Sequence, residues 1–189
     1  MSTAPDPKSS SELLIATIVA KHGFAIVPVG YGCCTEPGCC APRSRRPWAY
    51  TVGLADRGLP ELMLFGLSIE EAHGGLNSLA AEMRAGRQPE DDEPFLLGGV
   101  PIKVVDVPPQ WLMLDRGRMA MWFDYFRGRS DPAVRQLVWP DEDGLFPDDP
   151  GCDPQVRREQ PILRDNPRSF PKPHNAYRKS RRSYRTRRR

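Results

Sequence analysis

The chain has 189 residues, of which 39% are hydrophobic and 27% charged, and this is enough for one domain with a core of its own. No apolar run approaches the roughly 18–20 residues that cross a bilayer. The first residues also lack the basic and then apolar layout of a signal peptide. The sequence therefore predicts no membrane-spanning segment, and it favours a cytoplasmic protein.

The net charge of +3 is divided unevenly along the chain. Residues 168–189 hold ten of the 27 basic residues and no acidic one, so residues 1–167 hold 17 basic and 24 acidic residues, a net of −7. The apolar pattern also stops near residue 164. The sequence therefore predicts a disordered leader over 1–10, a globular domain over 11–164 and a disordered Arg-rich tail over 165–189.

The first elements expected are one helix and three strands. SELLIATIVAKHG has apolar residues at helical spacing, and Gly23 is a typical stop. Strands are expected over 24–30, 48–54 and 61–67. Pro28 places the first strand near a sheet edge, because proline cannot donate to a ladder. The last strand is continuously apolar, which predicts cover on both faces.

The second half of the domain is also predicted to contain both helices and strands. Ser68 and Glu71 have the spacing of a capping box, which predicts a helix through Met83. A hairpin around Gly98–Gly99, a helix over roughly 116–126 and a strand over 133–141 follow. The pattern predicts a single compact α+β domain, with a mixed or mainly antiparallel sheet packed with about three helices.

Four of the five cysteines lie within one short stretch, GYGCCTEPGCCAP. They are Cys33, Cys34, Cys39 and Cys40. Zinc is one interpretation, with Cys152 or His22 as an outside ligand, and a reversible disulfide is another. Structural zinc sites combine two separated pairs of ligands, and adjacent cysteines point apart. The spacing therefore favours an exposed, reduced loop, and no cofactor is predicted.

Five residues are candidates for lining a small-molecule cleft, because ligand sites combine apolar walls with few polar groups. They are Tyr50, Thr51, Glu61, Trp139 and Asp141. The alternative is that Asp141 caps a turn with Gly144 and that Glu61 is a solvated strand end.

No catalytic motif is found, and no nucleophilic side chain can be identified that would pair with one of the three histidines as a general base. His22 ends a helix, His73 lies in a capped helix and His174 lies in the tail. The sequence favours ordinary surface roles for all three, and no enzymatic reaction is predicted.

The tail has the composition of a nucleic-acid-binding segment, because Arg binds phosphates and both Arg and Tyr stack on bases. The candidate residues are Arg178, Lys179, Arg181, Arg182, Tyr184, Arg185, Arg187 and Arg188. We expect non-specific, salt-dependent contact of residues 168–189 with RNA or DNA. A solvated tail, anionic lipid and the acidic domain itself are the alternatives.

Several short motifs occur together in one order. They are Lys21-His22-Gly23, Ala49-Tyr50-Thr51-Val52-Gly53-Leu54, Gly58-Leu59-Pro60-Glu61-Leu62, Leu76-Asn77-Ser78-Leu79-Ala80, Gln136-Leu137-Val138-Trp139-Pro140-Asp141 and Gln160-Pro161. Over residues 12–164 the chain resembles the bacterial family known as domain of unknown function 4262. The resemblance implies one compact bacterial domain and no established activity, cofactor or site.

Three functions remain open from the sequence. The first is an uncharacterised cytosolic domain with a nucleic-acid-binding tail. The second is a small-molecule-binding or enzymatic domain, and the third is a cysteine-based metal or redox sensor. No oligomeric state is predicted.

Overall fold

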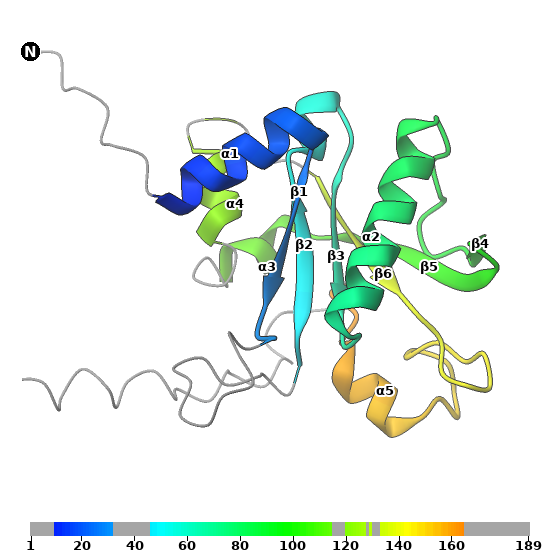
Figure 1. The fold of residues 1–189 in the computed structure, drawn as a ribbon. Helices are drawn as coiled ribbons and strands as arrows, with labels where there is room; N and C mark the ends of the chain where they lie inside the picture. The colour runs from blue at the N-terminus through cyan, green and yellow to red at the C-terminus, as the bar shows by residue number, and fades with distance from the viewer. Residues whose placement is uncertain (1–9, 32–45, 115–119, 128, 130–132, 165–189) are drawn as a thin grey trace, which may run out of the picture.

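The structure is a computed structural model, and it describes residues 10–31, 46–114, 120–127, 129 and 133–164 (Figure 1). The strands are β1 (Ala25–Val29), β2 (Trp48–Val52), β3 (Glu61–Phe65), β4 (Phe95–Leu97), β5 (Val100–Val107) and β6 (Val134–Val138). The helices in these ranges are α1 (Ser10–His22), α2 (Ile69–Arg84), α3 (Pro109–Leu114), α4 (Ala120–Tyr125) and α5 (Pro154–Glu159), with a 3₁₀ turn, η1 (Leu54–Arg57).

The six strands form one mixed sheet in the order β1-β2-β3-β6-β5-β4. Every neighbouring pair is antiparallel except β3 and β6, which run parallel in the centre with Glu61 opposite Val134. β1 is an edge strand, as Pro28 predicts. The predicted α+β fold with a mixed sheet is confirmed.

The sheet is covered differently on its two faces (Figure 1). We call them the α2 face and the α1 face after the helices that cover them. On the α2 face, Ala49, Leu62, Leu64, Val104 and Leu137 pack with Ala72, Leu76, Leu79, Ala80 and Met83 of α2. On the α1 face, Trp48, Tyr50, Val52, Met63 and Val134 pack with residues of α1, α3 and α4. β3 is therefore buried on both sides, in agreement with its continuous apolar sequence.

The helix predictions are confirmed for α1 and α2. Ser68 caps α2: its hydroxyl accepts from the Glu71 amide at 3.2 Å, and the Glu71 carboxylate accepts from the Ser68 amide at 2.9 Å. Of the helix expected over 116–126, α4 lies in the described residues and 115–119 lie outside them.

Two short helices, α3 and α5, have no counterpart in the sequence prediction. Six residues are too few to show a helical period, although each helix begins with a proline, which is favoured at the first helical position. In α5 the Asp153 side chain also caps the start, accepting from the Gln155 amide at 2.6 Å.

Candidate functional site

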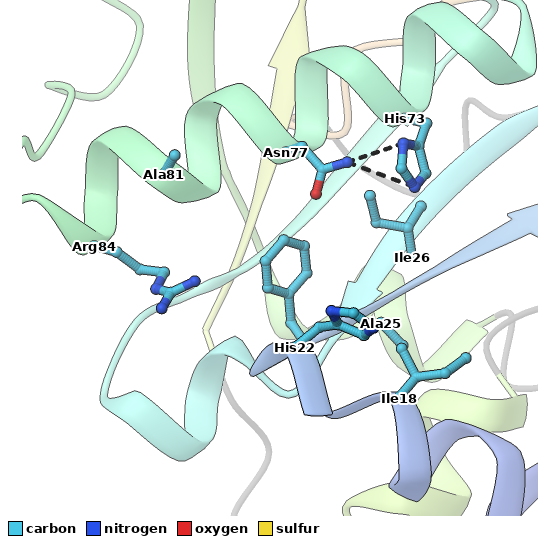
Figure 2. A pocket seen from close by; sticks show the side chains of 9 residues that line it. Ile18, His22, Ala25, Ile26, His73, Asn77, Ala81 and Arg84 are labelled. Carbon is cyan, nitrogen blue, oxygen red and sulfur yellow. Dashed lines mark hydrogen bonds between the residues drawn. The ribbon is translucent and has the colours of Figure 1, made fainter. Parts of the chain in front are cut away.

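A pocket of about 530 Å³ lies on the α2 face, beside the edge strand β1 (Figure 2). Its origin is geometric. Six strands spaced about 4.8 Å apart span roughly 24 Å, whereas a helix with its side chains is only about 10 Å across. Because α2 is the helix that packs on this face among the described residues, the flank of α2 toward β1 is left as a hollow, and the end of α1 closes one side.

Three elements line the pocket: α1, the start of β1 with the residue before it, and α2. The lining residues are Ile18, His22, Phe24, Ala25, Ile26, His73, Asn77, Ala81 and Arg84. Figure 2 shows Asn77 and Arg84 extending from α2 into the hollow, with His22 and Ile18 of α1 on its other side. The walls are mostly apolar, and the polar groups are two histidines, one amide and one guanidinium.

Asn77 fixes the orientation of His73. The Asn77 side-chain nitrogen lies 2.9 Å from His73 Nδ1, one helical turn away, and 3.5 Å from Nε2. With the amide donating to Nδ1, a neutral imidazole holds its proton on Nε2. The Asn77 oxygen is turned away from the ring (Figure 2). His73 thus presents an N–H donor, and Asn77 an acceptor.

Arg84 and His22 supply the remaining polar groups, and among the residues that the structure describes no carboxylate lines the pocket. In the part of the chain that the structure describes, no hydrogen bond or ion pair engages the Arg84 or His22 side chain. The ionisable groups on the described lining of the pocket are therefore basic.

Two of the residues named from the sequence, Thr51 and Glu61, form a buried pair. The Thr51 hydroxyl donates to Glu61 Oε2 at 2.5 Å and accepts from the Leu62 amide at 2.8 Å. Glu61 Oε1 accepts from the amides of Gly53 and Ala55 at 2.8 and 3.0 Å. Burial raises the pKa of Glu61 above its ordinary value of 4.5, although these donors favour the ionised form. With Glu61 only 1% exposed, the pair holds the start of η1 and faces no solvent.

η1 connects this buried pair to the pocket end of α1. Asp56 of η1 accepts from Tyr125 Oη at 2.5 Å and pairs with Arg129 at 2.5 Å. The next residue, Arg57, packs its guanidinium against Gly23, directly after His22. Glu61 thus supports the segment against which α1 ends.

Tyr50 lies on the other face of the sheet. It is buried, with its ring stacked 5.1 Å from that of Trp48, in the cluster that also contains Trp122 of α4. Burial raises the pKa of the Tyr50 hydroxyl. Tyr50 is a core residue of the α1 face.

Trp139 takes part in a set of hydrogen bonds that joins β6 to the segment after α5. Its indole N–H donates to the Phe65 carbonyl at 2.9 Å, its amide donates to Gln160 Oε1 at 3.0 Å, and its carbonyl accepts from Gln160 Nε2. Gln136 makes a second pair of bonds, donating to the Pro161 carbonyl and accepting from the Leu163 amide, both at 2.9 Å. These motif residues therefore stabilise the fold.

Asp141 organises the loop after β6. Oδ1 accepts from the amides of Asp143 and Leu145 at 3.0 and 2.8 Å, and Oδ2 accepts from the Asp153 amide at 2.8 Å. The amides of Asp153 and Leu145 lower the pKa of Asp141. Burial raises the pKa of the neighbouring Cys152 thiol above its ordinary value of 9.0, which disfavours the reactive thiolate.

The structure therefore brings Thr51 and Glu61 together and separates this pair from Trp139 and Asp141. Glu61 begins β3 opposite the first residue of β6, while Trp139 follows the last residue of β6, at the other end of the parallel pair. None of the five named residues lines the pocket beside β1.

The pocket residues were missed because His22 and His73 were assigned ordinary surface roles. A signal does exist in α2: His73, Asn77, Ala81 and Arg84 follow at helical spacing, beside the apolar stripe that contains Leu76, Leu79 and Met83. Polar residues that flank the buried stripe of a helix lie at the edge of the surface that the helix covers, where a pocket can form.

Cys33, Cys34, Cys39 and Cys40 and all eight nucleic-acid candidates of the tail lie outside the described residues. Among the residues that are described, no three His, Cys, Asp or Glu side chains converge on a point that a metal ion could occupy. Within the same residues no helix is long and apolar enough to cross a membrane.

Comparison with known proteins gives one family. The family model described as Domain of unknown function (DUF4262) matches residues 18–153, which is most of the chain and includes every lining residue of the pocket. No curated protein and no solved structure matches. The chain belongs to the DUF4262 family.

Proposed function

We propose that this protein binds a small molecule in the pocket between α1, β1 and α2. The observation that carries the proposal is the pocket itself. Its volume of about 530 Å³ falls in the range of ligand sites, and its walls are apolar with a few polar groups. Binding is therefore assigned to His22, His73, Asn77 and Arg84, with the apolar side chains of the walls as packing surface.

The polar groups argue against an accidental gap in the packing. A hollow left by poor packing would be lined by apolar atoms, whereas here four side chains that carry donors border one space. His73 is moreover held by Asn77 at 2.9 Å, and this orientation reduces the entropy lost when a ligand binds.

The proposal is tested by filling the pocket. Ala81 lines it and is exposed, so Ala81→Trp places an indole in the hollow without disturbing the core. Ala85 is also exposed, one turn further along and outside the pocket, and Ala85→Trp is the matched control. A fragment library is screened by ¹H–¹⁵N NMR against the wild-type protein and both variants.

We expect bound fragments to shift amide signals of α2 and β1 in the wild-type protein and in Ala85→Trp, and to lose this effect in Ala81→Trp. A screen in which no fragment shifts these signals, or in which Ala81→Trp binds as well as the control, would contradict a ligand site here.

We propose nucleic-acid binding by residues 168–189 as a second function, on the observation that ten Lys/Arg and no Asp/Glu occur in this segment. Binding rests on release of counterions from phosphates, so it weakens steeply with salt. Tyr184 among the arginines adds stacking on unpaired bases.

Deleting residues 168–189 leaves an acidic protein, and we expect it to lose at least roughly tenfold in affinity for nucleic acid at low salt. Fluorescence anisotropy with a single-stranded RNA and a duplex DNA of equal length measures the loss. The full chain is the control, titrated with salt. Equal affinity of the truncated and full chains would refute the role of the tail.

A further inference from the structure

The charge of the pocket differs from that of the domain around it. Residues 1–167 carry a net charge of −7, yet the three ionisable residues that line the pocket, His22, His73 and Arg84, are all basic. Two acidic residues on the lining elements and the adjoining turn are engaged elsewhere: Asp56 pairs with Arg129, and Glu82 pairs with Arg87 at 2.9 Å. A basic hollow in an acidic surface selects negatively charged ligands.

The hydrogen-bonding groups point to acceptor oxygens on that ligand. A guanidinium is only a donor, and it matches the two oxygens of a carboxylate or a phosphate in a fork. His73, with Nδ1 accepting from Asn77, has its donor on Nε2. Figure 2 shows Arg84 and His73 at opposite ends of the pocket, because eleven residues of helix separate them by about 16 Å along the axis, so the fork of Arg84 is the group that can hold an anionic head.

The apolar walls indicate that the anionic group is attached to an apolar body. Ile18, Phe24 and Ile26 line the pocket together with the methyl groups of Ala25 and Ala81. An inorganic ion would leave this surface in contact with water, whereas an attached ring or chain would bury it, at about 25 cal/mol per Å² of apolar area.

We infer that the pocket binds an organic oxyanion, a carboxylate or phosphate ester on an apolar, ring-sized body. Arg84 receives the anionic head, and the wall of Ile18, Phe24 and Ile26 receives the body. This inference rests on the proposed small-molecule site and adds the chemical class of its ligand.

The test uses four probes on the full-length protein: naphthoate, naphthyl phosphate, the uncharged naphthamide and inorganic phosphate. Affinities come from calorimetry and positions from amide shifts in α2 and β1. Naphthoate or naphthyl phosphate should bind in the pocket at least roughly tenfold more tightly than naphthamide, the gain typical of a charge-assisted bond. The tighter of the two anions identifies the head group. Inorganic phosphate should bind more weakly than either.

Arg84→Gln should remove this preference, lowering affinity for the anion roughly tenfold and leaving naphthamide unchanged. Arg87→Gln is the matched control, because Arg87 lies just beyond α2 and does not line the pocket. Circular dichroism confirms that both variants fold.

Naphthamide binding in the pocket as tightly as the anions would overturn the oxyanion inference and leave the ligand site in place. The same holds if no naphthyl probe binds while other fragments do. An empty fragment screen would instead remove the proposed function and the inference with it.

Discussion

Glu61 is a carboxylate that the fold buries almost completely, and its effect on stability follows from its bonds. It accepts from Thr51 and from two amides of the turn that follows β2. Burial nevertheless raises its pKa above 4.5. The native state therefore holds this proton at pH values at which the unfolded chain has released it. The contribution of Glu61 to stability accordingly falls as pH rises from 4.5 through the native pKa.

We expect Glu61→Gln to remove this pH dependence. The amide keeps one acceptor oxygen for Gly53 and Ala55, so the variant folds, but it does not titrate. The free energy of unfolding of the wild-type protein, minus that of the variant, should fall as pH rises above the ordinary carboxyl range. Urea unfolding from about pH 4 to about pH 8 measures it.

Glu70→Gln, at an exposed position on α2, is the control, and its difference from the wild-type protein should not show this decline. If the difference in free energy of unfolding between the wild-type protein and Glu61→Gln stays constant or rises with pH, the hydrogen bonds to Glu61 affect its pKa at least as much as burial does.

At the scale of elements, the segment after α5 is attached to β6 by two buried glutamines. Gln160 pairs with both backbone groups of Trp139, and Gln136 pairs with Pro161 and Leu163. Each amide has a donor and an acceptor, so one side chain can satisfy two backbone groups of an irregular segment. This explains why polar residues occupy fully buried positions at the end of the sheet.

Replacing Gln160 by Leu keeps the volume and removes both bonds. Because the amide and carbonyl of Trp139 are left without these partners, we expect a loss of about 2–4 kcal/mol in the free energy of unfolding. Gln155→Leu, at an exposed position in α5, should change stability by less than about 0.5 kcal/mol. Chemical unfolding of both variants measures the difference. Equal losses in the two variants would show that the hydrogen bonds between Gln160 and Trp139 do not stabilise the fold.

Which elements could be predicted depends on the length of their signal. α1, α2 and the strands have repeated apolar positions or a cap, as at Ser68, and were found. α3 and α5 contain too few residues to show a period. The candidate site was predicted less well, because burial is a property of the whole fold. Glu61 is the first residue of an apolar strand, a position that can equally be exposed, and it is enclosed because the turn that contains Gly53 folds over it.

At the scale of the whole molecule, the two functions proposed belong to different parts of the chain. The pocket lies in the domain that matches the family model, whereas the basic residues of the tail follow residue 167, beyond the matched range. Ligand binding is therefore expected to be a property of related domains, and nucleic-acid contact a property of chains with a similar extension. Arg164, the last residue before the undescribed C-terminal range, pairs with Asp92 at 2.5 Å.

The parallel pairing of β3 with β6 at the centre of the sheet also has a consequence for synthesis. β1, β2 and β3 form one antiparallel group, and β4 with β5 forms another, so each can pair soon after it leaves the ribosome. The strand that joins the two groups is β6, which is made last of the six. Until then the inner edges of β3 and β5 have no partner. Such edges bind other chains, so the interval before β6 emerges is when the nascent protein is most exposed to misassembly.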